Sequence, residues 1–304
     1  MVDLLVVGDA NPDLVLTGDV VPRFGQAEQD VEAAVTLGGS GAIAAAALAR
    51  LGVAVAIAAA IGDDDLGRLI EARLGERGVA TGALQRSARP TGLSVHLLRR
   101  GDRAILTSTG AIADLDVAAA CSEIGPGVRH VHLSSVYLVP ALVADGRRVL
   151  DAARAAGATV SVDTNYDPSE AFAAPNWLRA ADVILPNAAE ARALTGREDV
   201  AAAARDLAAG GATVAVKLGA DGALAVAGPT GDVVRAAAPP APAVVDAVGA
   251  GDAFDAGFVR GRLDGRPLAG CLALACAAGT LSLRDRGDGG HATLDEALAL
   301  SGTA

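Results

Sequence analysis

The chain has 304 residues, of which 52% are hydrophobic but only 2% aromatic, and its formal net charge is −11. This length fits one large α/β domain with a core of Ala, Val, Leu and Ile. The acidic balance argues against nucleic-acid or membrane-surface binding, which would need a basic face. Three cysteines without a C-x-x-C pair indicate neither a disulfide framework nor a zinc site, and fit buried thiols in a reducing cytoplasm.

The N-terminus predicts a buried strand followed by a polar turn. Leu4–Val7 is a continuous apolar run, without the basic start of a signal peptide, and residues 8–13 are polar. In open α/β sheets, ligands bind at the carboxyl ends of strands. Asn11 and Asp13 are therefore placed to bind a hydroxylated ligand, although turns favour Asn and Asp in any case.

A glycine-rich turn, Gly38-Gly39-Ser40-Gly41, opens an Ala-rich helix that ends near residue 51. Residues 15–36 are irregular, and residues 92–98 and 104–107 form a hairpin turned at Gly101-Asp102, so we expect a small sheet outside the main body. Ser40 also lies in a near miss to the G-x-S-x-G nucleophile elbow. With His291 as base, it would give an α/β hydrolase, which leaves Asp252 unexplained.

From Val53 onward the pattern is of repeated βα units. We expect strands at 53–61, 128–133, 159–162 and 213–218, and helices at 143–156, 253–262, 268–283 and 293–300. Asp63-Asp64-Asp65 is predicted to cap a helix and complement its dipole. His130 and His132 share one strand face, as packed imidazoles or, less simply, a metal pair.

The stretch DAVGAGDAFDAGF, residues 246–258, carries the chemistry. Gly249, Ala250 and Gly251 have little or no side chain, so their amides can converge on an anion at the start of a buried helix. Asp252 next to that hole suits a base that takes a proton from a hydroxyl during phosphoryl transfer. The alternative is a glycine-rich turn with Asp252 as N-cap. Lys217, the only lysine, is followed by Leu218, which excludes a P-loop.

This stretch resembles the C-terminal signature of the ribokinase (PfkB) family of small-molecule kinases, close to D-T-x-G-A-G-D-x-F, with Ala247 in place of Thr. The resemblance implies a single ribokinase-like domain over 1–304. It would be a three-layer α/β/α fold with a mostly parallel sheet and a discontinuous β lid from about 13–35 and 91–108. The implied activity is ATP-dependent phosphorylation of a hydroxyl on a sugar or nucleoside, with Asp252 as base and residues 249–251 as anion hole.

Further matches to the family imply further roles. An N-x-D at Asn11 and Asp13 would bind sugar hydroxyls, and the glycine-rich turn at Gly38, Gly39 and Ser40 would let the backbone approach the sugar. An N-x-x-E at Asn187 and Glu190 would organise Mg²⁺ through water, the alternative being a helix cap. The remaining implied contacts are to ATP, from Lys217, Gly219 and Gly222, and to a monovalent cation such as K⁺, from the Asp246 side chain and the Val248 carbonyl.

Two positions depart from the family pattern. Ile43 replaces a usual Asn, and Asp167 replaces a common Arg in the D-x-N-x-R-P stretch at 163–168. Such departures suit a catalytically silent sugar or nucleotide sensor, but an intact 249–252 argues against it. No basic cluster lies near the substrate turns, so an uncharged sugar or nucleoside is favoured. Relatives often dimerise through the lid, and the sequence does not settle whether this chain forms a homodimer.

Overall fold

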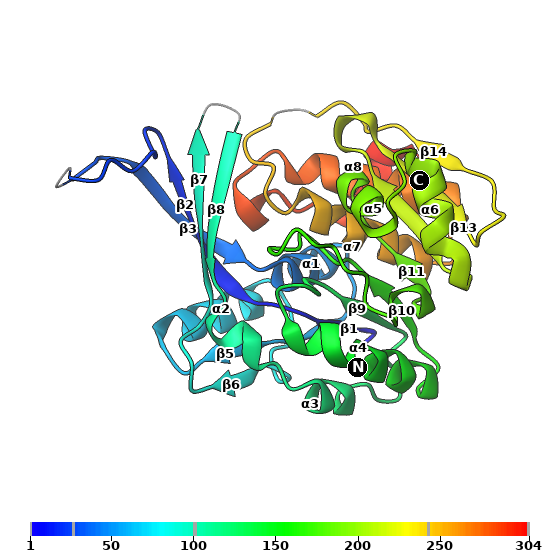
Figure 1. Ribbon diagram of the computed structural model, residues 1–304, viewed down its shortest axis with the longest axis horizontal. Coiled ribbons are helices and arrows are strands. Elements are labelled where there is room, and N and C mark those ends of the chain that lie inside the picture. The colour runs from blue at the N-terminus through cyan, green and yellow to red at the C-terminus, as the bar shows by residue number, and fades with distance from the viewer. Residues whose placement is uncertain (1, 26–27, 100–101, 242–243, 303–304) are drawn as a thin grey trace.

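The computed structural model describes residues 2–25, 28–99, 102–241 and 244–302 (Figure 1). Within these, the main sheet has the strand order β14-β13-β12-β11-β10-β9-β1-β4. Pairing is parallel from β4 through β12, and β13 and β14 are antiparallel. The strands are β1 (Leu4–Val7), β4 (Val55–Ala58), β9 (His130–Leu133), β10 (Thr159–Val162), β11 (Val183–Ile184), β12 (Thr213–Lys217), β13 (Ala223–Ala227) and β14 (Val234–Ala236).

Helices cover both faces of this sheet, which gives the three-layer arrangement expected from the sequence. Alternate residues of β1 enter different cores: Leu4 and Val6 join one cluster, Leu5 and Val7 the other. The first cluster packs on α1 (Ser40–Arg50), α2 (Asp65–Glu76), α7 (Ala250–Leu263), α8 (Leu268–Ser282) and α9 (Leu294–Ser301). The second packs on α3 (Val117–Ser122), α4 (Pro140–Ala155), α5 (Ala188–Thr195) and α6 (Val200–Leu207).

Small residues let α7 and α8 approach closely. A Cβ at Gly257 would stand 2.8 Å from the Ala275 Cα, and one at Gly261 would stand 3.0 Å from the Cys271 Cα. The scarcity of aromatic side chains is thus matched by tight helix contacts, in which even a methyl group would collide.

A second sheet stands off the main body, with the strand order β3-β2-β7-β8 (Figure 1). It comprises β2 (Asn11–Thr17), β3 (Glu32–Gly38), β7 (Leu93–Arg99) and β8 (Asp102–Ser108). The expected hairpin is present, although Gly101 of its turn lies outside the described residues. The prediction of a polar turn was wrong at Asn11 and Asp13. Both residues belong to the start of β2, where Asn11 pairs with Gly38 and Asp13 with Thr36.

The predicted strand over 53–61 is divided. β4 stays in the main sheet, whereas β5 (Ala60–Gly62) pairs with β6 (Gln85–Ser87) in a separate two-stranded sheet. Asp64 is the N-cap of α2 and accepts a hydrogen bond from the Gly67 amide, as the cap prediction required. Short 3₁₀ helices complete the described elements at Gly110–Asp114, Leu178–Ala180, Ala208–Gly210, Gly219–Asp221 and Gly287–Gly290.

His130 and His132 are packed imidazoles. His130 bonds the hydroxyls of Thr159 and Ser161, each at 2.7 Å, and His132 Nδ1 lies 2.8 Å from the Ser161 Oγ. They form a buried polar ladder across β9 and β10. Among the described helices, none combines the length and apolarity that crossing a bilayer requires.

Candidate active site

In the first turn of α7 the Ala250 amide makes a long bond of 3.4 Å to the Ala247 carbonyl oxygen, and among the described residues no acceptor meets the Gly249 and Gly251 amides. Gly249 is the N-cap residue, with φ +77° in the left-handed region, and provides no side-chain cap. Asp252 is the third residue of the helix, so the N-cap alternative for Asp252 was wrong. An uncapped N-terminus with small residues at 249–251 suits an anionic ligand, because free amides and the helix dipole both face it.

Asp252 is buried behind this turn, with 6% of its surface exposed. Carboxylate oxygens of Asp252, Asp255 and Asp163 lie within 4.8 Å of one another. Burial raises the pKa of Asp252 well above its usual value, and the nearby Asp163 raises it further, while the Lys217 charge and a Ser40 hydrogen bond oppose the rise. A carboxyl group with a raised pKa is suited to accept and hold a proton.

Lys217 ends β12 and points into this acidic cluster. Its Nζ lies 2.5 Å from the Asp163 Oδ2 and 3.1 Å from the Asp255 Oδ1, and its side chain is only 12% exposed. The ion pair between Lys217 and Asp163 is therefore buried. A Cβ placed on Gly251 would be 3.6 Å from Nζ, so the ammonium lies beside the first turn of α7.

Asn165 joins three elements at the carboxyl edge of the sheet. Its Oδ1 accepts from the Ser135 amide at 2.7 Å, and its Nδ2 donates to the Ser40 Oγ and the Asp163 Oδ2. Its φ is +55°, a conformation that Asn tolerates better than most residues. Asn165 was not among the predicted site residues, although its place after β10 in the D-x-N stretch was the available signal.

Asn11 and Asp13 lie together at the start of β2, in the second sheet. Asn11 Nδ2 donates to the Asp13 Oδ1 at 3.0 Å, and both residues are almost wholly buried. Cβ atoms at Gly38 and Gly39 would stand 2.0 Å from the Asp13 Oδ1 and 3.0 Å from the Asn11 Oδ1. The glycine pair thus makes room for these polar side chains.

His96 of β7 completes this corner, and sequence reasoning missed it. Its Nε2 lies 3.1 Å from the Asp13 Oδ2, with both side chains about 95% buried. Ser94 lies two residues earlier on the same strand face, and its Oγ accepts a hydrogen bond from the side-chain Nδ2 of Asn11. The period-2 alternation of the predicted hairpin strand was the signal that placed both side chains on one face.

Asn187 and Glu190 form a capping box at the start of α5. The Asn187 Oδ1 accepts from the Glu190 amide, and the Glu190 carboxylate accepts from the Asn187 amide at 2.8 Å. The helix-cap alternative is therefore confirmed. Burial, followed by the charge of Asp163, raises the pKa of Glu190 to about 7, against the opposing charge of Lys217.

Two glycines shape the turn after β12. Gly219 (φ +63°) and Gly222 (φ +86°) bracket a single 3₁₀ turn, and a Cβ at Gly222 would stand 2.1 Å from the Ala236 carbonyl oxygen. Asp246 is held by backbone donors, since its two oxygens accept from the amides of Val248 and Gly287.

A cavity of about 1180 Å³ separates the second sheet from the segment before α7. The sheet contributes Thr17, Leu98 and Arg103, and the segment contributes residues 244–248, which end one residue before Gly249. Asp252 itself does not line this cavity, because it lies buried in the first turn of α7.

The model of the pfkB family carbohydrate kinases matches residues 1–293. This chain belongs to that family. It is a sugar or nucleoside kinase, a phosphotransferase with an alcohol group as acceptor. It is 30% identical to a 2-dehydro-3-deoxygluconokinase of Bacillus subtilis, over 83% of this chain and 82% of the relative. It is 33% identical to an ATP-dependent ribose-1-phosphate kinase of Halopiger xanaduensis, over 98% of each.

Solved structures agree with the family assignment. A ribokinase of Arabidopsis thaliana, complexed with ribose and ATP, is 26% identical and superimposes with a TM-score of 0.86 over 99% of both chains. The ribokinase-like fold predicted from the sequence is therefore confirmed, with its mostly parallel sheet and its small additional sheet.

The departures from the family pattern have local packing roles. The Ile43 Cγ2 would lie 2.9 Å from a Cβ at Gly249, so this side chain packs on the turn of the anion hole. The Asp167 carboxylate accepts from the Ser169 and Phe172 amides and closes its own loop. Neither position removes a group from the acidic cluster around Asp252.

The hydrolase alternative finds no support in this kinase. The Oγ of Ser40, in the first turn of α1, accepts a hydrogen bond from the side-chain Nδ2 of Asn165. The charges that act on His291 are those of Asp288, Arg77 and Arg50, the last residue of α1. Eleven helical residues span roughly 16 Å, so the proposed base lies near the opposite end of α1 from its nucleophile.

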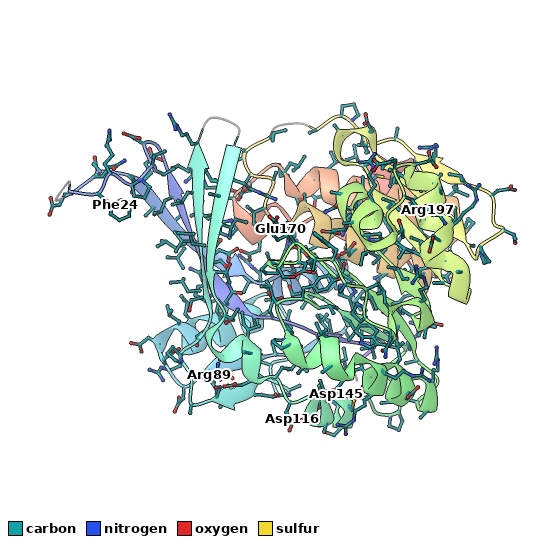
Figure 2. The ribbon with its side chains drawn as sticks, viewed as in Figure 1. Phe24, Arg89, Asp116, Asp145, Glu170 and Arg197 are labelled. Atoms are coloured by element: carbon teal, nitrogen blue, oxygen red, sulfur yellow. The ribbon has the colours of Figure 1, made fainter. Side chains whose placement is uncertain are left out.

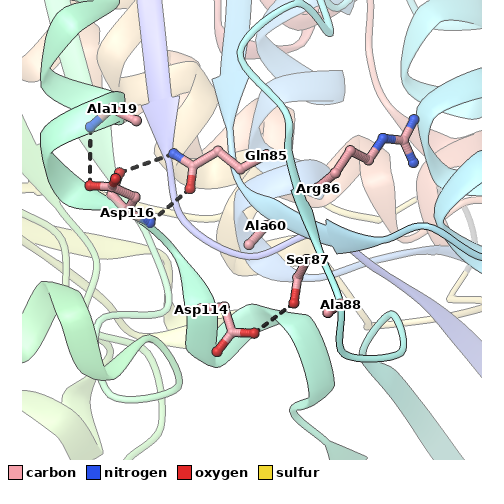
Figure 3. A pocket seen from close by; sticks show the side chains of 8 residues that line it. All are labelled: Ala60, Gln85, Arg86, Ser87, Ala88, Asp114, Asp116 and Ala119. Atoms are coloured by element: carbon pink, nitrogen blue, oxygen red, sulfur yellow. Dashed lines mark hydrogen bonds between the residues drawn. The ribbon is translucent and has the colours of Figure 1, made fainter.

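A second hollow, of about 410 Å³, lies by β5 and β6 (Figure 3). Its polar side chains bind one another: Ser87 donates to Asp114 at 2.6 Å, and Gln85 bonds the backbone of Asp116. None of the predicted site residues lines it. We therefore place the chemistry at the α7 turn.

Proposed function

We propose that the chain transfers the γ-phosphoryl group of ATP to a hydroxyl of an uncharged sugar or nucleoside, with Asp252 as general base. The observation that carries this proposal is the pairing of the Asp252 carboxylate with the uncapped N-terminus of α7. Base and anion hole belong to one helical turn, so the base can act on the acceptor hydroxyl while the amides act on the phosphoryl group that this hydroxyl attacks. The ribokinase that was solved with ribose and ATP supports a sugar as the acceptor and ATP as the donor.

The reaction divides between two groups of residues. Asp252 accepts the hydroxyl proton as the substrate oxygen forms its bond to the γ-phosphorus and the bond to the bridging oxygen of ADP breaks. The amides of Gly249, Ala250 and Gly251 stabilise the charge on the transferred phosphoryl oxygens. Asn11 and Asp13, with the Gly38-Gly39-Ser40 turn, orient the acceptor. Their buried, mutually bonded polar groups suit hydroxyl recognition.

The nucleotide is proposed to lie along the edge formed by β12 and α5. Gly219 and Gly222 allow the backbone to approach it, and Lys217 lies behind the phosphates. Both Glu190 oxygens already accept from Asn187, so this carboxylate fits a magnesium ion bound through water better than one bound directly. Mg²⁺, when bound with ATP, offsets the negative charge of the phosphates. Asp246 and the Val248 carbonyl are proposed to hold a monovalent cation.

The second sheet is proposed to act as a lid, and β2 and β7 bring Asp13 and His96 into contact beneath it. The sheet carries the exposed apolar side chains Val35, Ile105 and Leu106, and the segment between β2 and β3 carries Val21 and Phe24. Phe24 projects freely from the end of this sheet (Figure 2). These residues support a homodimer through the lid, and light scattering would report its mass.

Asp252→Asn tests the central claim. We expect turnover to fall by about 10²–10⁴-fold, the usual contribution of a general base, with ATP affinity unchanged. Asp145→Asn, at an exposed position on α4 (Figure 2), is the matched control. Near wild-type turnover in Asp252→Asn would show that Asp252 is not the base. Release of ADP over a panel of sugars and nucleosides separates the kinase from a silent sensor, which would bind without turnover.

A further inference from the structure

The sole lysine occupies an unusual position for a residue near a phosphate site. Both groups within hydrogen-bond distance of the Lys217 Nζ are carboxylates, Asp163 at 2.5 Å and Asp255 at 3.1 Å. An ammonium already shared by two carboxylates has little freedom to move toward a phosphate. Because it also lies behind Gly251, its charge acts on the α7 turn from the protein side.

The charge balance around Asp252 depends on this lysine. Three carboxylates with oxygens within 4.8 Å of one another cannot all ionise in a buried site without a cation. The titratable groups that act on Asp252 or on its neighbours Asp163 and Lys217 come from every packed element: Asp9 (after β1), His132 (β9), Asp163 (after β10), Glu190 (α5), Lys217 (β12) and Asp255 (α7). His132 is held neutral by burial, so Lys217 is the cation of this set.

We propose that Lys217 is a positioning residue, an internal counter-ion to the carboxylates beside Asp252, which lowers the cost of ionising Asp252 and so makes it available as the base. The inference rests on the proposed function, since it assigns the control of the same base. Under this proposal Lys217 acts on the α7 turn through its charge and is not a ligand of ATP.

The protonation of the neighbours supports this assignment. Burial raises the pKa of Asp255 well above its usual value, as it does for Asp252, and the Lys217 charge opposes both rises. Burial alone would raise the pKa of Asp163, but Lys217 and the Asp255 hydrogen bond lower it overall. Asp163 is thus the carboxylate that pairs with Lys217 as an ion, and the same ammonium favours the ionised form of Asp252.

The pH dependence of turnover tests the proposal. In Lys217→Met we expect kcat/KM for the acceptor at pH 7 to fall by about 100-fold, within the range for loss of a general base. The base would titrate at higher pH, so turnover should recover by about tenfold for each pH unit up to the new pKa. The KM for ATP should stay near the wild-type value. Lys217→Arg should lose less turnover at pH 7 than Lys217→Met, because it keeps the charge.

Two further variants isolate the role of charge from that of packing. Asp255→Asn removes one carboxylate from beside Asp252 while Lys217 stays, so we expect the pH profile of kcat/KM to move toward lower pH. In Lys217→Met/Asp163→Asn the cation and its anion are removed together. We expect this double variant to regain a large part of the turnover lost in the single variant, an interaction that a double-mutant cycle measures. Thermal unfolding and circular dichroism confirm that each variant folds.

The outcomes decide between a counter-ion and a phosphate ligand. A raised KM for ATP with an unmoved pH profile in Lys217→Met would make Lys217 a phosphate ligand and overturn the proposal. If Lys217→Met does not fold, Asp255→Asn decides, since a pH profile of kcat/KM that does not move toward lower pH would contradict electrostatic control of Asp252 by this cluster. Full turnover of Asp252→Asn would instead refute the base itself, whatever the Lys217 variants show.

Discussion

The carboxylate of Asp13 lies against the Cα of Gly38, in a space that a single methyl group would fill. A Cβ at residue 38 would stand 2.0 Å from the Asp13 Oδ1 and 2.2 Å from its Cγ. The same carboxylate receives hydrogen bonds from Asn11 and His96, so its position is set by β2, β3 and β7 together.

Gly38→Ala is therefore expected to displace Asp13 and impair the acceptor site. We expect kcat/KM for the acceptor to fall by about tenfold or more, as misplaced substrate contacts do, with the KM for ATP unchanged. Gly75→Ala is the matched control, because its new Cβ in α2 meets nothing within 4 Å and favours the helix. Equal acceptor kinetics in the two variants would show that Asp13 does not orient the acceptor.

Gly222 is predicted to be essential for the turn on the nucleotide side. Its φ of +86° disfavours any side chain, and its Cβ would collide with the Ala236 carbonyl oxygen. Gly222→Ala should raise the KM for ATP and lower the melting temperature. Gly228→Ala (φ +69°) carries backbone strain but no collision, so it should cost only about 1 kcal/mol of stability. A Gly222→Ala variant that matches Gly228→Ala in both measurements would contradict a nucleotide role for this turn.

The sequence predicted those features that depend on local chemistry. The apolar strands, the helix cap at Asp64 and the glycine-rich turn before α7 follow from short stretches, and the structure confirms them. The family signature then gave the fold. A signature of this kind works because the glycine-rich turn and Asp252 lie within one helical turn.

Contacts between distant segments were beyond reach from the sequence alone. The Lys217–Asp163 ion pair spans 54 residues and the Asn11–Ser94 bond spans 83, and no local pattern sets either. The start of β2 at Asn11 was missed for a similar reason, because pairing with β3 overrides the turn preference of the polar residues in this segment.

Potassium dependence is expected if Asp246 and the Val248 carbonyl hold a monovalent cation. The Asp246 oxygens are fixed by the amides of Val248 and Gly287, so the carboxylate is already oriented. Turnover should be lower in K⁺-free buffer than in K⁺. Asp246→Asn places an amide donor against a backbone donor and should remove that difference. Equal wild-type turnover in the two buffers would exclude the cation.

Buried imidazoles predict a loss of stability in acid. Burial, followed by the charges of His132 and Arg262, lowers the pKa of His130 to about 3 from its ordinary 6.5. The unfolded chain binds a proton below 6.5 and the folded chain does not. The contribution of His130 to the unfolding free energy is therefore complete above pH 6.5 and lost as the pH falls toward 3.

Comparison with His130→Gln isolates this effect from Glu190, whose raised pKa acts in the opposite direction. Urea unfolding should show the wild type more stable than the variant at pH 7.5, because the variant loses the bonds to Thr159 and Ser161. The difference should shrink by about 1.4 kcal/mol for each pH unit below 6.5. A difference that stays constant down to pH 4.5 would mean that His130 is protonated in the folded protein, against the neutral imidazole that its buried place between two hydroxyls requires.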